Sequence, residues 1–254
     1  MAKFALQLYT VREPAKKDLK GTLTRAREIG YEYVQWSGMP KLPANEIRAM
    51  LDDLGMKVIA VHTGVEAFEK DFAAELLFWK TVGTPFIATG GMPKDNQGSL
   101  EDWKRGAERL GKIGAALDRA GIDYGYHNHA GEFEKYPEDD RLKIDILMEL
   151  TKPEHLKFEM DVAWVYVGGQ DPAAYLRKYK GRCPVIHIKD VAKDQPEGKH
   201  VFTELGQGVL DMAELLKAGQ ESGVEWYVYE QDTVPGDPLD SAKISYDWLK
   251  ENIR

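Results

Sequence analysis

The sequence predicts a single α/β domain, in which eight strands and eight helices alternate and close into a (β/α)₈ barrel, the TIM barrel architecture. Short runs of apolar, β-branched and aromatic residues recur about every 32 residues. Each run is followed by a longer amphipathic segment, and many of these segments stop at glycine. No Pro-, Gly- or Ser-rich tract and no charge block resembles a linker, so residues 1–254 are expected to form one domain.

Eight segments have the length and composition of strands. Their alternation with helical segments favours a parallel sheet, and eight such units can close into a barrel. An open dinucleotide-binding sheet is disfavoured because the first strand–helix turn lacks a G-x-G-x-x-G run. The expected strands are Phe4–Val11, Tyr33–Gly38, Val58–Gly64, Phe86–Gly91, Asp123–His129, Leu156–Trp164, Val185–Asp190 and Trp226–Asp232.

The intervening segments carry helix signals. Apolar residues at helical spacing precede Gly30 and Gly55. Ser99 and Asp102 form a capping-box start for a helix that should stop near Gly121. Two more helices are expected to begin at Asp171-Pro172 and to span Pro238–Ile253, the latter with Leu239, Ile244 and Trp248 facing inward.

Charge and composition narrow the class of protein. Cys183 is the only cysteine, so no internal disulfide can form, which fits a reducing compartment. The sequence contains no apolar run long enough for a signal peptide or a membrane helix, so a cytoplasmic protein is expected. The net charge of −8 disfavours nucleic acid and anionic membranes as partners.

Polar residues collect where the expected strands end, which is the face that carries the active site in such barrels. Four of the six histidines lie there. Residues at i and i+2 of a strand share one face, so His187 should point the same way as Lys189, and Glu230 the same way as Asp232. The strand-end residues are Gln7, Tyr9, Arg12, His62, His127, His129, Glu132, Glu159, Asp161, Trp164, His187, Lys189, Asp190, Glu230 and Asp232.

A ring of carboxylates and imidazoles around one mouth is costly to bury unless a cation lies among them. Carboxylates with imidazole and without thiolate suit one divalent ion, Mn²⁺, Mg²⁺, Zn²⁺ or Co²⁺. Each residue alone also has a structural interpretation. Asp190 would then cap the next helix, Trp36 and Trp164 would be core residues, and Gly206-Gln-Gly208 would be a plain turn rather than a phosphate-binding one.

Five motifs in order extend the analysis to a family. YHNHAGEFE, MDVAWVYVGGQDP, HIKD, ELGQGVLD and YEQD resemble the xylose isomerase-like superfamily of TIM barrels, which includes sugar phosphate isomerases and epimerases, inosose dehydratase, lyases of 3-keto-glycosides and, more distantly, endonuclease IV. The resemblance covers nearly the whole chain. It implies a sugar-like small-molecule substrate, and a homo-oligomer is compatible with it.

The resemblance also implies a ligand set for one divalent metal ion. Asp161, His187 and Glu230 match the family's aspartate, histidine and glutamate of strands six, seven and eight. Many relatives have a glutamate on strand five, where this chain has His127, so the ligand there is His127 or, alternatively, His129 or Glu132. Epimerases of the family use two metal-bound glutamates as acid and base, and one of that pair is missing here.

The predicted activity is a metal-dependent sugar isomerase or epimerase that acts through an enediolate. Glu230, His127 and Lys189 are the predicted catalytic residues, and His62, His129, Glu132, Trp164 and Gln7 the predicted substrate-binding residues. A structural ion pair with Asp161 or Glu159 is the alternative role of Lys189. The alternative activity is a metal-dependent lyase or dehydratase. A DNA-repair enzyme of the endonuclease IV type and a non-catalytic sugar-binding barrel are disfavoured, the first by the acidic charge and the second by the intact ligands.

Overall fold

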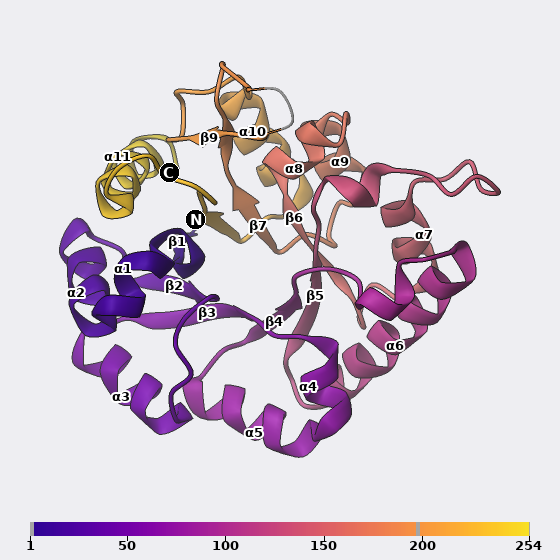
Figure 1. Cartoon of the computed structure of the whole chain (residues 1–254), viewed down its shortest axis with the longest axis horizontal. Helices are drawn as coiled ribbons and strands as arrows, with labels where there is room; N and C mark the ends of the chain where they lie inside the picture. The colour runs from indigo at the N-terminus through magenta and orange to yellow at the C-terminus, as the bar shows by residue number, and fades with distance from the viewer. Residues whose placement is uncertain (1–2, 197–198, 254) are drawn as a thin grey trace.

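The computed structural model describes residues 3–196 and 199–253 and shows the predicted barrel. Eight parallel strands close on themselves in chain order, the last pairing with the first (Figure 1). They are β1 (Lys3–Gln7), β2 (Tyr33–Trp36), β3 (Lys57–His62), β4 (Phe86–Thr89), β5 (Asp123–His127), β6 (Lys157–Asp161), β7 (Val185–Ile188) and β10 (Trp226–Tyr229). Two further short strands, β8 (Asp190–Val191) and β9 (Phe202–Thr203), pair antiparallel outside the barrel.

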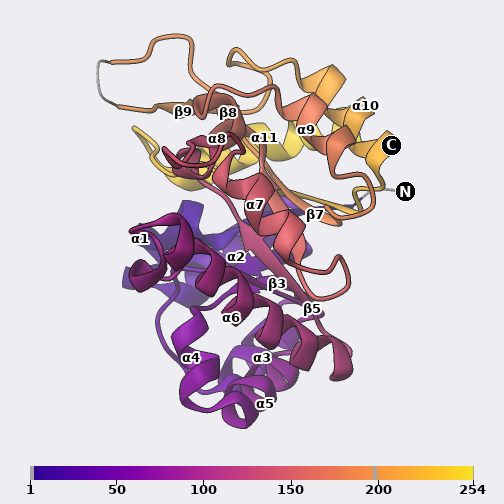
Figure 2. The same cartoon turned by 90° about the vertical axis from the view of Figure 1, so that its right-hand side faces the viewer.

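Helices surround the barrel, as the views of Figures 1 and 2 show. The α-helices are α1 (Arg12–Lys17), α2 (Leu19–Ile29), α3 (Ala44–Asp53), α4 (Val65–Lys70), α5 (Phe72–Val82), α6 (Leu100–Arg119), α7 (Lys143–Leu150), α8 (Val162–Val167), α9 (Pro172–Lys178), α10 (Met212–Ser222) and α11 (Pro238–Asn252). Short 3₁₀ helices are η1 (Leu8–Val11), η2 (Lys94–Asn96) and η3 (Ala130–Phe133). None of the described helices is long and apolar enough to cross a membrane.

The helix signals of the sequence act as expected. The Ser99 hydroxyl accepts from the backbone N–H of Asp102 at the start of α6, which ends before Gly121. Asp171 caps α9, with Pro172 in its first turn. One expectation is wrong: Ile244 lies on the solvent side of α11 and is 45% exposed, because the face of α11 toward the barrel carries Leu239, Ala242, Ser245 and Leu249 instead.

All eight expected strands end later than the observed ones, and two of them run into helices beside the site. Residues 8–11 form η1 instead of extending β1, and residues 162–164 already belong to α8. Apolar, β-branched sequence continues past both strands, so composition alone does not mark their ends. Asp161 does mark one end, because its Oδ1 atom accepts hydrogen bonds from the backbone N–H groups of Ala163 and Trp164 and thereby caps α8.

The inside of the barrel is layered. An apolar cluster fills the half of the barrel at the amino-terminal ends of the strands, and it includes Ala5, Phe86, Val185 and Val228. Two residues further along several strands the inward position becomes polar, as at Gln7, Gln35, His187 and Glu230. Alternation places both layers on the same face of each strand. The interior of the barrel therefore consists of a polar layer that rests on an apolar layer.

Candidate active site

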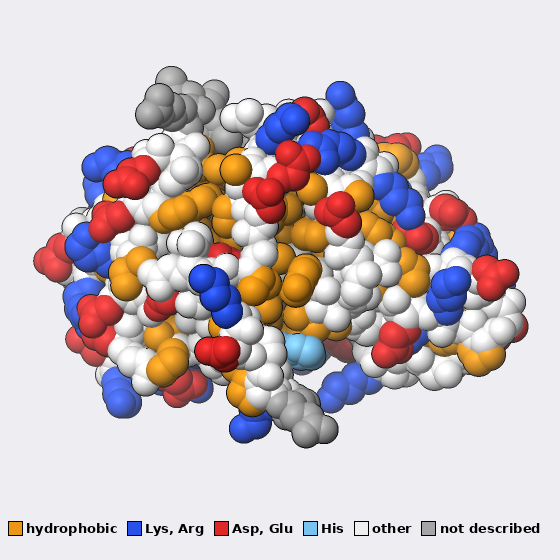
Figure 3. All heavy atoms as spheres, turned by 90° about the horizontal axis from the view of Figure 1, so that it is seen from above, with side chains coloured by type: hydrophobic (Ala, Val, Ile, Leu, Met, Phe, Trp, Pro, Cys, Tyr) orange, Lys and Arg blue, Asp and Glu red, His pale blue; other side chains and the backbone are white. Residues whose placement is uncertain are grey.

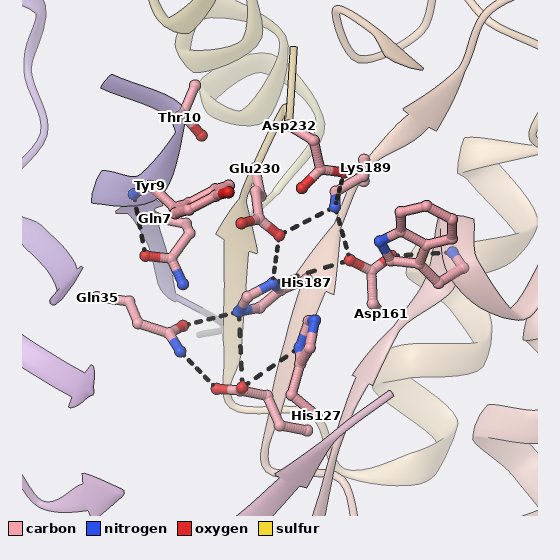
Figure 4. Close-up of polar contacts among 12 residues, drawn as sticks. Gln7, Tyr9, Thr10, Gln35, His127, Asp161, His187, Lys189, Glu230 and Asp232 are labelled. Atoms are coloured by element: carbon pink, nitrogen blue, oxygen red, sulfur yellow. Dashed lines mark hydrogen bonds and ion pairs between the residues drawn. The ribbon is translucent and has the colours of Figure 1, made fainter. Parts of the chain in front are cut away.

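The polar layer lies at the carboxyl ends of the strands and is almost completely buried (Figure 4). Strand register brings the residues together. His127 pairs with Glu159 across β5 and β6, and Asp161 pairs with His187 across β6 and β7. The side chains of Glu159, Asp161, His187 and Lys189 are 0% exposed. Such burial of charge requires compensation within the site.

Four predicted metal ligands converge. Single ligand-type atoms of His127, Asp161, His187 and Glu230 all lie within 4.8 Å of one another. The Nδ1 atom of His187 is 2.9 Å from Glu230 Oε2 and 3.9 Å from Asp161 Oδ2. Asp161 Oδ1 is used by the α8 cap, whereas its buried Oδ2 faces His187 and the ammonium of Lys189. The Oδ2 atom therefore already contacts one cationic group and is placed to bind a metal ion.

A chain of amides and carboxylates fixes the proton of His187. Glu159 accepts a hydrogen bond from Gln35 Nε2 at 2.8 Å, so the carbonyl oxygen of Gln35 faces His187 Nε2, 2.9 Å away. A carbonyl oxygen only accepts, which places a proton on Nε2. Nδ1 faces the carboxylate oxygens of Glu230 and Asp161, so it also carries a proton here and would give up that proton to bind a cation. This arrangement suits a metal-ligating histidine, whose other nitrogen usually donates to the protein.

The ammonium group of Lys189 lies in the same region and supplies a positive charge there. Its Nζ atom lies 2.9 Å from Asp161 Oδ2, 3.0 Å from Glu230 Oε2 and 2.8 Å from Asp232 Oδ2. The expected pairing of Lys189 with Asp161 is thus present, whereas Glu159 contacts His62 and Gln35 instead. One ammonium faces three carboxylates, which leaves an excess of negative charge that fits a divalent ion.

The electrostatics keep Glu230 ionised. Burial alone would raise the pKa of Glu230, but Lys189 and His187 outweigh it and hold that pKa well below its usual range. Burial alone would lower the pKa of His187, but Glu159 and Glu230 raise it. For His127, burial and the nearby His187 lower the pKa to about 3, so the ring is neutral and can donate a lone pair.

The predicted alternatives on strand five lie differently. Glu132 accepts hydrogen bonds from the Tyr126 hydroxyl at 2.7 Å and from the backbone N–H of His129 at 2.9 Å. The His129 side chain is exposed at the mouth, with its ring centre 5.1 Å from that of His127. Neither residue belongs to the metal-type clusters found among the described residues. Their contacts leave His127 as the strand-five group nearest the other ligands.

The remaining predicted substrate residues line the rim. His62 borders two cavities of about 460 and 500 Å³, one toward Thr89 and His129 and one toward Trp36. Trp164 stands between His129 and Phe202, with ring centres 5.5 and 5.1 Å from theirs, so it is a wall of the mouth rather than a core residue. Trp36, by contrast, is buried as expected.

Two buried donors at the mouth lack partners. Gln7 Nε2 and Trp164 Nε1 make no hydrogen bond with any described residue, although both atoms are buried. An unsatisfied buried donor is costly, by about 1–3 kcal/mol. A ligand with several hydroxyl groups would satisfy both donors.

Sequence reasoning missed Gln35 and did not assign a role to Glu159. Gln35 is a fully buried amide inside β2, and Glu159 a fully buried carboxylate inside β6. The available signal was a polar residue at the centre of an otherwise apolar strand, as in YVQW. Such a residue needs a buried partner, although the sequence does not say which one.

The glycine-rich turn has an internal ligand. Asp190 accepts hydrogen bonds from the backbone N–H groups of Gly206, Gly208 and Leu210, at 3.1, 2.9 and 3.2 Å. Asp190 therefore organises this turn and does not cap a helix. The N–H groups that a phosphate would need are already bound to a carboxylate, which agrees with a plain structural turn.

Comparisons with known proteins agree with the barrel fold. A family model described as "Xylose isomerase-like TIM barrel" matches residues 23–252. An inosose dehydratase from Clostridium perfringens is 27% identical over 215 residues, which cover 73% of this chain and 71% of that protein.

Solved structures share the fold. A sugar phosphate isomerase/epimerase from Parabacteroides distasonis superposes with a TM-score of 0.85 at 22% identity, over 99% of this chain and 98% of that one. The IolI protein with a bound zinc atom superposes with a TM-score of 0.74 at 16% identity, over 99% of each chain. Because the family model matches most of its length, the chain belongs to the xylose isomerase-like TIM barrel family.

Proposed function

We propose that this protein is a metal-dependent enzyme that removes a proton next to the carbonyl of a keto-sugar or cyclic keto-polyol and then expels a β-oxygen. The observation that carries the proposal is the convergence of ligand atoms of Asp161, His187 and Glu230, with His187 held by Gln35 so that its Nδ1 atom faces both carboxylates. His127 lies within reach as a fourth ligand. A divalent ion held there would polarise the substrate carbonyl and stabilise the enediolate.

The protein groups have separate roles in this proposal. Glu230 is ionised and lies at the mouth, so it accepts the proton from carbon. Lys189 places its ammonium beside Glu230 and Asp161, where it stabilises negative charge that develops on the substrate. Gln7 and Trp164 donate to substrate hydroxyls through their unpartnered N–H groups. These donors support a polyhydroxylated small molecule as the substrate.

Elimination is favoured over isomerisation by what lies opposite Glu230. A two-carboxylate exchange needs a second free carboxylate, yet strand five offers His127, and Glu132 is held by Tyr126 and the His129 backbone. The similarity to an inosose dehydratase supports the same choice.

An isomerase or epimerase, the activity predicted from the sequence, is the second candidate. The same enediolate gives either outcome, depending on whether a proton returns or an oxygen leaves. His62 Nε2, on β3, lies 2.5 Å from Glu159 Oε2. This pair lies in another part of the barrel and can carry a proton. This pair is the observation that supports proton return.

Product analysis tests the proposal. The metal-loaded protein is incubated with inosose, with 3-keto-glycosides and with simple keto-sugars, and the products are followed by ultraviolet absorption and mass spectrometry. Elimination predicts an unsaturated, ultraviolet-absorbing product that has lost water or an aglycone. A product of unchanged formula would replace the lyase with the isomerase or epimerase, and no reaction with any of the three classes would contradict both.

A further inference from the structure

A second group of ligand-type atoms lies deeper in the barrel than the predicted centre. It consists of His62, His127, Glu159 and His187, whose ligand atoms lie within 4.8 Å of one another. Three imidazole nitrogens surround Glu159 Oε2: His62 Nε2 at 2.5 Å, His127 Nδ1 at 3.5 Å and His187 Nε2 at 3.7 Å. This group shares His127 and His187 with the first group. It differs by containing His62 of β3 and Glu159 of β6.

The tautomer of His187 assigns that residue to the first centre. Its Nε2–H donates to Gln35, so Nδ1 is the nitrogen that can exchange its proton for a metal ion, and Nδ1 faces Asp161 and Glu230 (Figure 4). The deeper group is then left with His62, His127 and Glu159. Two imidazoles and one glutamate are a donor set found in catalytic zinc sites.

His127 faces the deeper group with an atom that has no other role. Its Nδ1 atom is buried, accepts no hydrogen bond from the described residues, and is directed at Glu159. Ligand atoms of a tetrahedral zinc ion lie about 3.3 Å apart. The His127–Glu159 distance, 3.5 Å, is close to this value, and His62, which is 16% exposed at the cavity wall, would need to move outward by only about 1 Å.

The geometry points to a second divalent-ion site formed by His62 Nε2, His127 Nδ1 and Glu159, with a preference for Zn²⁺ or Co²⁺. His127 then belongs to this site, and the first centre keeps Asp161, His187 and Glu230 with open positions for substrate. Charge supports two ions: three carboxylates, Asp161, Glu230 and Asp232, face the one ammonium of Lys189. Glu159 adds a fourth carboxylate that is fully buried. No lysine or arginine is paired with Glu159 among the described residues, so an ion there competes only with the protons of the neighbouring histidines.

Zinc titration of the chelator-stripped protein tests the second site without reference to turnover. Calorimetry combined with elemental analysis should give about two equivalents for the wild type and about one for Glu159→Gln. Asp161→Asn should also bind about one, at the other site. Asp145→Asn, a mostly buried carboxylate on α7 that bonds Tyr179 outside the barrel, should keep both.

Cobalt spectra assign the ion that each variant keeps. In Asp161→Asn, bound Co²⁺ should show the intense absorption of a four-coordinate site, and His62→Ala added to that variant should abolish it. The proposal is overturned if the folded wild type saturates at one equivalent and Glu159→Gln does not change it. It is equally overturned if folded Glu159→Gln binds no metal, since that would mean one shared centre. Absence of enzymatic activity would contradict the proposed function and leave these stoichiometries unaffected.

Discussion

Lys189 is the residue that links stability to metal binding. A fully buried lysine normally has a lowered pKa, but here Asp161, Glu230 and Asp232 outweigh the effect of burial and raise it. The ammonium therefore neutralises part of the charge of the centre when no metal is bound. A divalent ion between Asp161 and Glu230 competes with this ammonium for the same oxygens.

Lys189→Met should make the metal-free protein less stable and the metal bind more tightly. Removal of one partner from a buried ion network costs about 3–5 kcal/mol, because the carboxylates lose their counter-charge. Thermal unfolding with and without Mn²⁺ should show a large loss that the metal largely restores. Lys193→Met, an exposed lysine nearby, is the control and should change neither quantity. Equal destabilisation of Lys189→Met with and without saturating metal would contradict competition.

Gln35 acts on the metal through His187 and Glu159. Gln35→Leu removes the acceptor that fixes His187 Nε2–H and the donor that reaches Glu159. Loss of such a supporting hydrogen bond typically weakens metal binding by about 10–100-fold. Calorimetric titration should show this loss while Gln220→Leu, on the exposed face of α10, binds like the wild type. Unchanged affinity in Gln35→Leu would mean that His187 is oriented by packing alone.

At the scale of elements, the segment after β7 is held by one carboxylate. Asp190 begins β8, and the turn that contains Gly208 wraps around its side chain. A Cβ atom at Gly208 would lie 2.1 Å from Asp190 Oδ1 and 2.3 Å from the carbonyl oxygen of Val191. The HIKD and ELGQGVLD motifs therefore form one structural unit beside the mouth.

Gly208→Ala should destabilise the protein by about 1–3 kcal/mol, the usual range for overpacking. Gly236→Ala is the matched control, because nothing lies within 4 Å of its added Cβ, and its effect should stay within about 0.5 kcal/mol. Urea unfolding measures both. A loss in Gly208→Ala no larger than in Gly236→Ala would show that the turn can move away from Asp190.

For the whole molecule, periodic signals predicted the fold well. The alternation of apolar and amphipathic segments gave all eight barrel strands, because each strand has a fully buried position in the closed sheet. Strand ends were less predictable. Asp161 is both the last residue of β6 and the cap of α8, and its local sequence is compatible with a longer strand.

The site was predictable only in part, for a physical reason. Asp161, His187 and Glu230 stand at strand ends and match family motifs, whereas the role of Gln35 depends on which side chain faces it across the barrel. Sequence spacing gives the face of a strand but not the partner opposite, because that partner is set by barrel closure. Of the three carboxylates around Lys189, the sequence analysis named only Asp161 as a possible partner, and Glu230 and Asp232 were not paired with Lys189 for the same reason.

The two candidate reactions, elimination and isomerisation or epimerisation, both begin with one proton transfer at this centre. The surface in Figure 3 shows acidic and basic side chains interspersed around a hydrophobic middle, without a continuous basic area among the atoms it colours. In the proposed mechanism, Glu230 abstracts this substrate C–H proton.

Deuterium exchange tests this proton abstraction directly. Inosose is incubated in D₂O with the metal-loaded protein, and the carbon next to the carbonyl is followed by NMR in substrate and product. Exchange or elimination should stop when a chelator removes the metal, should return when the metal is restored, and should fall about 100-fold or more in Glu230→Gln at saturating metal. Undiminished reaction in Glu230→Gln, or in protein shown by elemental analysis to contain no metal, would contradict the account.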